Sequence, residues 1–131
     1  MILPILLLSI WTPPITCTAV DGDTLRCSEI GRVRLLGIDA PEMPGHCRKG
    51  RACAPGDPVA SKKALEKMVS SVVTISPVTR DRYGRTVAQA YAGDKNLACE
   101  QLRAGRAVYV EKWDNGQRLA KECRYARRRG S

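Results

Sequence analysis

Phenylalanine is absent from this chain of 131 residues, and aromatic residues of all kinds make up only 5% of it. Proteins that bind single-stranded nucleic acid mainly by base stacking depend on aromatic side chains, so the composition argues against that class. Histidine occurs once, as His46. Ribonuclease chemistry that uses two histidines and histidine-rich metal centres are therefore excluded.

Long hydrophobic runs are also lacking. Residues 1–11 are apolar apart from Ser9, but spanning a bilayer takes about 20 apolar residues. A shorter apolar start is typical of a secretory signal. We therefore expect residues 1–15 to be an apolar signal segment, with no stable membrane insertion, and residues 16–131 to form one domain of a secreted or periplasmic protein. The alternative is a buried first strand that begins upstream of Thr16.

Acidic residues are in the minority. The chain has 22 Lys and Arg against 13 Asp and Glu, which gives a formal net charge of +9. Such a surface favours polyanions, and nucleic acid is the default partner of a small basic domain. Charge alone does not decide the question, since many basic proteins bind no nucleic acid.

Six cysteines support export, because disulfides persist in oxidising compartments. Cys17 and Cys27 are equidistant from Gly22, so a hairpin turn centred there would pair them. A second pair, Cys47 and Cys53, brackets a short basic loop, which leaves Cys99 and Cys123 to link two helices. A zinc site built on His46, Cys47 and Cys53 is the weaker alternative, because there is no Cys-x-x-Cys pair and the fourth ligand is missing.

Turn residues divide the chain into short elements. A hairpin is predicted over residues 16–20 and 24–27 around Asp21-Gly22, followed by a third strand over 32–38. The proline- and glycine-rich stretch 42–58 is a predicted loop, and apolar spacing from Val59 predicts a helix. Two further strands, 72–78 and 86–91, precede a helix capped by Asn96 and a last helix over 117–128. This pattern indicates a small α+β domain in which a barrel is possible.

Three segments place acidic and basic residues around turns. They are Asp21-Gly22-Asp23-Thr24, the stretch Arg-Leu-Leu-Gly-Ile-Asp-Ala-Pro-Glu over 34–42, and Asp81-Arg82-Tyr83-Gly84-Arg85. Together they supply carboxylates for a metal ion, one further carboxylate and two guanidiniums, a set that suits metal-assisted attack on a phosphodiester.

Each of these residues also has an ordinary structural explanation when it is taken alone. The two aspartates could stabilise a turn and cap a loop, and Glu42 could be a solvated loop residue. Arg34 could face outward from its strand and pair with Asp81, and Arg85 could be surface charge. The joint occurrence of the three segments, in this order, favours the site over these explanations.

The three segments resemble the staphylococcal nuclease family in their order and in their residues. The resemblance extends from about Thr16 to the C-terminal helix. The resemblance implies an α+β fold, an OB-fold-like five-stranded β-barrel with three α-helices and an active site at one edge. It also implies calcium (Ca2+) ligands: the carboxylates of Asp23 and Asp39 and the backbone carbonyl of Ala40, where the family archetype has threonine. Such hard oxygen ligands suit calcium or magnesium.

The same resemblance implies roles for five further residues. Glu42 would be the general base that activates water, and the guanidiniums of Arg34 and Arg85 would hold the phosphate through two-point contacts. Tyr83 and Tyr109 would contact a base or sugar. For Tyr109, packing is the alternative, because the spacing around it departs from the archetype.

The function that we expect is calcium-dependent phosphodiester hydrolysis of DNA and RNA by a monomer. Strong sequence specificity is not expected, since the key groups address phosphate. One alternative is a catalytically inactive nuclease-like domain that only binds nucleic acid. Another is a disulfide-stapled interaction module that uses the basic loop from Arg48 to Arg51.

Overall fold

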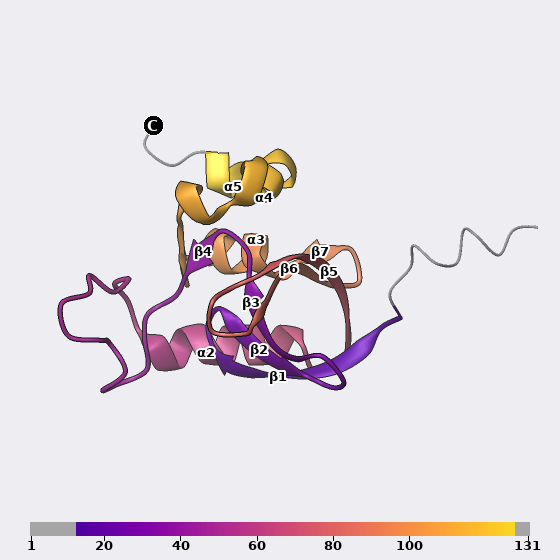
Figure 1. Cartoon of the computed structure of the whole chain (residues 1–131), viewed down its shortest axis with the longest axis horizontal. Helices are drawn as coiled ribbons and strands as arrows, with labels where there is room; N and C mark the ends of the chain where they lie inside the picture. Colours follow the sequence, from indigo (N-terminus) through magenta and orange to yellow (C-terminus); the bar gives the residue numbers. More distant parts are fainter. Residues whose placement is uncertain (1–12, 128–131) are drawn as a thin grey trace, which may run out of the picture.

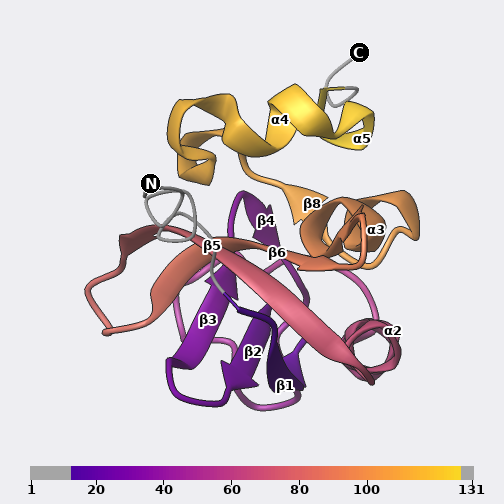
Figure 2. The ribbon, with the colours of Figure 1, turned by 90° about the vertical axis from the view of Figure 1, so that its right-hand side faces the viewer.

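The computed structural model describes residues 13–127, so most of the expected signal segment lies outside the described part. Five strands form a closed barrel: β1 (Ile15–Asp21), β2 (Thr24–Cys27), β3 (Gly31–Leu35), β5 (Val72–Arg80) and β6 (Thr86–Ala92). Their order is β3-β2-β1-β5-β6, and a parallel pairing of β3 with β6 closes the barrel (Figures 1 and 2). The predicted five-stranded barrel is confirmed.

The barrel interior is filled by alternate residues of the strands, as the two-residue period of a strand requires. Leu25, Val33, Val73 and Ala90 are fully buried there. The helix α2 (Pro58–Met68) packs against β1 and buries Leu65, and Asp57 caps its first turn by accepting from two backbone N–H groups. The long segment between β3 and α2 contains only the short strand β4 (Ile38–Asp39), which pairs with β8 (Val108–Tyr109).

The C-terminal third stacks helices above one end of the barrel (Figure 2). β7 (Lys95–Asn96) leads into α3 (Leu97–Arg103), and the side chain of Asn96 accepts from the N–H of Cys99, as predicted for its cap. Two 3₁₀ turns, η1 (Glu111–Trp113) and η2 (Asn115–Gln117), come before the last helical segments.

The prediction of one continuous last helix over 117–128 is wrong. The segment forms two short helices, α4 (Arg118–Glu122) and α5 (Arg124–Arg127), and Cys123 between them has extended backbone angles of φ −134° and ψ 106°. Cys123 is buried and bonded to Cys99 of α3. The chain therefore leaves helical geometry to bring this sulfur against α3.

Three disulfides are present: Cys17–Cys27, Cys47–Cys53 and Cys99–Cys123. Cys17 lies opposite Cys27 in the register of the β1–β2 hairpin, as expected from their equal distance to Gly22. The predicted pairing is confirmed, and no thiol remains for the alternative zinc site. None of the helices within residues 13–127 has the length and apolarity needed to cross a membrane.

Candidate active site

The β1–β2 turn and the end of β4 bring two buried carboxylates to one place. Asp23 accepts from the backbone N–H of Ala40 at 2.8 Å through Oδ2 and from the hydroxyl of Thr24 at 2.9 Å through Oδ1. Asp39, the last residue of β4, is 6% exposed, and Asp23 is 5% exposed. Residues that are sixteen positions apart in the sequence thus come together, and their role as calcium ligands stays a prediction.

Gly22 and the helices behind it hold the carboxylate turn in position. A Cβ atom at Gly22 would lie 1.8 Å from Oγ of Ser61 and 2.8 Å from Cβ of Ala40, so only glycine fits. The side-chain amide of Gln101 donates to the carbonyl of Gly22 at 2.8 Å and to that of Ser61 at 3.0 Å. Helices α2 and α3 therefore fix the turn from inside the molecule.

Arg34 lies between the two carboxylates. Its Nη1 is 3.4 Å from Oδ2 of Asp23, and its Nη2 is 3.6 Å from Oδ1 of Asp39. Nη1 also donates to the carbonyl of Ile38 at 2.9 Å, and the guanidinium lies 5.5 Å from the ring centroid of Trp113. The alternative of an outward-facing residue paired with Asp81 is therefore wrong.

Arg85 reaches the same edge of the barrel through the parallel pairing of β3 with β6. Arg34 pairs in register with Val87, and Arg85 precedes Val87 by two residues. Its Nε donates to Oδ2 of Asp81 at 2.7 Å, and its guanidinium lies 5.5 Å from the ring centroid of Tyr83. The predicted pair of arginines therefore flanks one site.

Glu42 has a partner that the sequence did not reveal. Nη1 of Arg51 is 2.6 Å from Oε2 of Glu42, and Nη2 is 2.9 Å from Oδ2 of Asp39. Burial raises the pKa of Asp39, and the positive charge of Arg51 opposes that rise. Arg51 thus bridges the expected base and an expected metal ligand.

Asp21 adds a third carboxyl group to the turn. Its Oδ1 accepts from the N–H of Asp23 at 3.1 Å. Burial, followed by the negative charge of Asp23, raises the pKa of Asp21 to about 7. Burial and the neighbouring carboxylate of Asp23 thus both favour the neutral form of Asp21.

The donor set fits a hard divalent cation. Among the described residues, Oδ1 of Asp39 is buried without a hydrogen-bond partner and lies 3.6 Å from Nη2 of Arg34, so it could accept a hard cation as a further partner. No group of three His, Cys, Asp or Glu side chains within residues 13–127 is arranged to hold a metal by itself. A cation at Asp23 and Asp39 would therefore also need backbone, water or phosphate oxygens.

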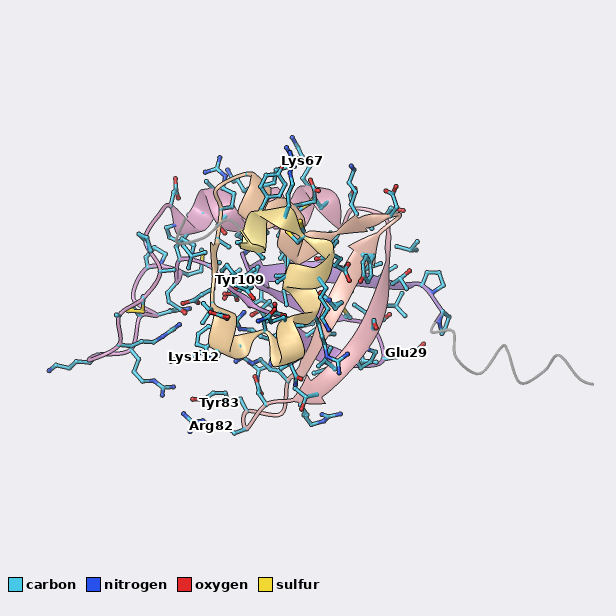
Figure 3. The ribbon with its side chains drawn as sticks, turned by 90° about the horizontal axis from the view of Figure 1, so that it is seen from above. Glu29, Lys67, Arg82, Tyr83, Tyr109 and Lys112 are labelled. Carbon is cyan, nitrogen blue, oxygen red and sulfur yellow. A yellow bond between two sulfur atoms is a disulfide. The ribbon has the colours of Figure 1, made fainter. Side chains whose placement is uncertain are left out.

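These side chains open into a cleft with a volume of about 1010 Å³. Its lining includes Asp21, Asp23, Arg34, Glu42, Tyr83 and Arg85, and a basic rim of Arg32, Arg48, Lys49, Arg51, Arg82 and Lys112. Figure 3 shows Arg82 and Tyr83 projecting outward on the face opposite Lys67.

Tyr109 is not among the residues that line this cleft. Its hydroxyl donates to Oδ2 of Asp114 at 2.7 Å, and Asp114 in turn accepts from the N–H groups that begin α4. Tyr109 therefore packs against the segment that precedes α4, and its contact with a base or sugar stays a prediction. Trp113, which the sequence analysis did not select, lines the cleft instead.

Comparison with known proteins gives a consistent result. The family model described as "Staphylococcal nuclease homologue" matches residues 32–130. An "Uncharacterized endonuclease" of Haemophilus influenzae is 33% identical over 120 residues, which cover 78% of this chain and 62% of that protein. A protein of the same name from Escherichia coli O157:H7 is 31% identical over 121 residues, with 83% of this chain and 73% of the relative covered.

A fungal relative, "Probable endonuclease LCL3" of Clavispora lusitaniae, is 39% identical over 87 residues. The matched part is 60% of this chain and 34% of that protein. The chain thus spans less than two thirds of the H. influenzae and fungal relatives. With the match over residues 32–130 and the barrel described above, the chain belongs to the staphylococcal nuclease homologue family.

Proposed function

We propose that the protein is a calcium-dependent nuclease that hydrolyses phosphodiester bonds in DNA and RNA. The observation that carries the proposal is the position of Arg34 between Asp23 and Asp39, with Glu42 and Arg85 lining the same cleft. This arrangement provides a base for the attacking water, two guanidiniums for the phosphate and a pair of carboxylates for the metal ion. The family and the names of its relatives support it.

In the proposed reaction, Glu42 takes a proton from water as the water oxygen attacks phosphorus. Nη1 of Arg51 now donates to Oε2 of Glu42 at 2.6 Å, so the proton would go to the other carboxylate oxygen, Oε1, unless Arg51 moves away. The bond from phosphorus to the leaving oxygen breaks, and that oxygen is protonated by solvent. Arg34 and Arg85 donate to the phosphoryl oxygens, on which charge develops.

Asp23, Asp39 and the carbonyl of Ala40 would hold the calcium ion. Once bound, the ion would neutralise charge on the phosphoryl oxygens. Tyr83 is 48% exposed at the mouth of the cleft, where its ring can contact a base or sugar. Because most of these groups address phosphate, cleavage has no strong base-sequence specificity.

The three disulfides support a secreted or periplasmic location for the active monomer. The alternative, an inactive domain that only binds nucleic acid, would not require the base and both arginines in one cleft. Incubation of labelled single-stranded DNA and RNA with the protein, in calcium or in chelator, separates the two. Calcium-dependent cleavage supports the nuclease, and binding without cleavage in either condition rejects it.

A further inference from the structure

The loop closed by Cys47 and Cys53, here called the disulfide loop (residues 46–53), concentrates positive charge at the cleft. It carries Arg48, Lys49 and Arg51, and all three line the cleft and are exposed. The loop buries no apolar side chain, since every residue from 46 to 52 is exposed. A covalent closure over six positions therefore holds a segment that no hydrophobic core would order.

Two further contacts fix where the disulfide loop lies. Arg51 anchors it to the carboxylates of Asp39 and Glu42. At the Asp81–Arg85 turn, Nη2 of Arg82 donates to the hydroxyl of Tyr83 at 3.2 Å, and Arg82, together with Arg48 of the loop, lowers the pKa of that hydroxyl. The loop thus extends along the cleft from Glu42, the expected base, toward Tyr83 of the Asp81–Arg85 turn.

The positive charges of the disulfide loop indicate which kind of ligand it binds. Within the described residues, neither Arg48 nor Lys49 forms an ion pair with an acidic side chain. Holding adjacent cations in a closed loop costs free energy through their mutual repulsion, and a polyanion in the cleft removes that cost.

We propose that the disulfide loop is a second phosphate-binding site, which holds the nucleic-acid strand beside the bond that is cleaved. Arg48 and Lys49 contact phosphates next to the scissile one, and the Cys47–Cys53 bridge orders them before the substrate arrives. The inference rests on the proposed nuclease function, because it takes the phosphodiester strand in the cleft as the ligand.

The test measures binding without cleavage. The affinity for a fluorescent single-stranded DNA oligonucleotide is measured by anisotropy in chelator, over a series of salt concentrations. Because log K falls as log salt rises, the slope is negative, and each lost phosphate contact reduces its magnitude by about 0.7. Arg48→Ala/Lys49→Ala should therefore reduce the magnitude of the slope by about 1.4. The charge-matched control is Lys63→Ala/Lys67→Ala, on exposed positions of α2 outside the cleft.

The proposal is supported if the slope becomes shallower for the loop variant and stays unchanged for the α2 variant. Equal slopes for the parent and the loop variant, or equal losses in both variants, overturn it. Cys47→Ser/Cys53→Ser keeps every charge and should bind several-fold more weakly at one salt concentration. Unchanged affinity in that variant overturns the role given to the bridge.

Failure of this proposal can be told apart from failure of the nuclease proposal. A protein that cleaves DNA in calcium while the loop variant keeps the parental slope remains a nuclease without this second site. A protein that shows the expected loss of slope but cleaves nothing binds the strand through the loop and is not a nuclease.

Discussion

Arg51 donates to Oδ2 of Asp39 across 2.9 Å, and in doing so it places a positive charge on the carboxylate that the proposed calcium ion would use. A cation bound through the other oxygen, Oδ1, would be repelled by this guanidinium. We therefore expect Arg51→Ala to bind calcium about fivefold more tightly, as the loss of a competing ion pair worth about 1 kcal/mol implies. Calorimetric titration without nucleic acid measures this directly.

The control for that titration is Arg82→Ala, which removes the same charge from the rim without touching either carboxylate. If both variants change calcium affinity equally, the effect is one of overall charge. Weaker binding in Arg51→Ala would show that Arg51 supports the cation site and does not compete for it.

Glu42→Gln tests the proposed base. The amide can still accept a hydrogen bond from Arg51 but cannot take a proton from water. Turnover should fall by about a hundred- to a thousandfold, the scale seen when one key catalytic group is removed, while the affinity for DNA in chelator changes little. Glu66→Gln, at an exposed position of α2, is the matched control. Cleavage by Glu42→Gln within a few-fold of the parent would remove Glu42 from the mechanism.

Arg34→Ala should lower turnover on a similar scale and, unlike Glu42→Gln, should also destabilise the fold. Asp23 and Asp39 lose the cation between them while they remain buried. Removing one partner of a buried ion pair costs about 3–5 kcal/mol, to be discounted here because Arg51 still pairs with Asp39. Urea unfolding with and without calcium measures the loss in free energy of unfolding. A bound cation should restore part of that loss. A variant as stable as its parent would contradict this account of Arg34.

Magnesium should bind and compete but support little turnover, whereas millimolar calcium should restore full cleavage after chelation. Calcium accepts six to eight ligands at roughly 2.3–2.6 Å, but magnesium requires a near-octahedral shell at about 2.0–2.1 Å. The shorter shell should draw the phosphate away from the water that Glu42 activates. Initial rates on single-stranded DNA, with each ion added back separately, decide the matter. Equal activity in magnesium would reject the calcium assignment.

Stability at alkaline pH should depend on Tyr91. Its hydroxyl donates to Oε1 of Glu122 at 2.8 Å, and burial, followed by Glu122, raises its pKa from 10.0 to about 12. The folded state thus favours the neutral phenol, so this contribution is complete below pH 10 and is lost as the pH rises toward 12. Tyr91→Phe and Glu122→Gln should both flatten the alkaline decline in urea midpoint. A decline as steep as that of the parent in both variants would show that another group causes it.

Local sequence signals predicted much of this structure. The hairpin, the cap at Asn96 and the disulfide pairing each depend on residues close in the chain or symmetric about a turn. The meeting of Asp23 with Asp39 was available only through the family resemblance, because it depends on barrel closure.

What sequence reasoning missed lies in long-range contacts. Arg51 lies in a loop where any cation looks like surface charge, and only the path of the disulfide loop turns it toward Asp39 and Glu42. The ring of Trp113 lies against the guanidinium of Arg34, although the two residues are 79 positions apart in the sequence. The break at Cys123 follows from its bond to Cys99, which overrides the helical preference of the residues around it.

The hydrogen bond from Gln101 to the carbonyl of Gly22 connects the carboxylate turn to α3, so the position of the turn depends on the stability of the whole domain. Backbone N–H groups held in such a place exchange with solvent only when a large part of the fold opens. The N–H of Ala40, bound to Asp23, should therefore exchange its hydrogen as slowly as the core strands do. The carboxylates held by this turn should therefore stay in place each time a strand enters or leaves the cleft.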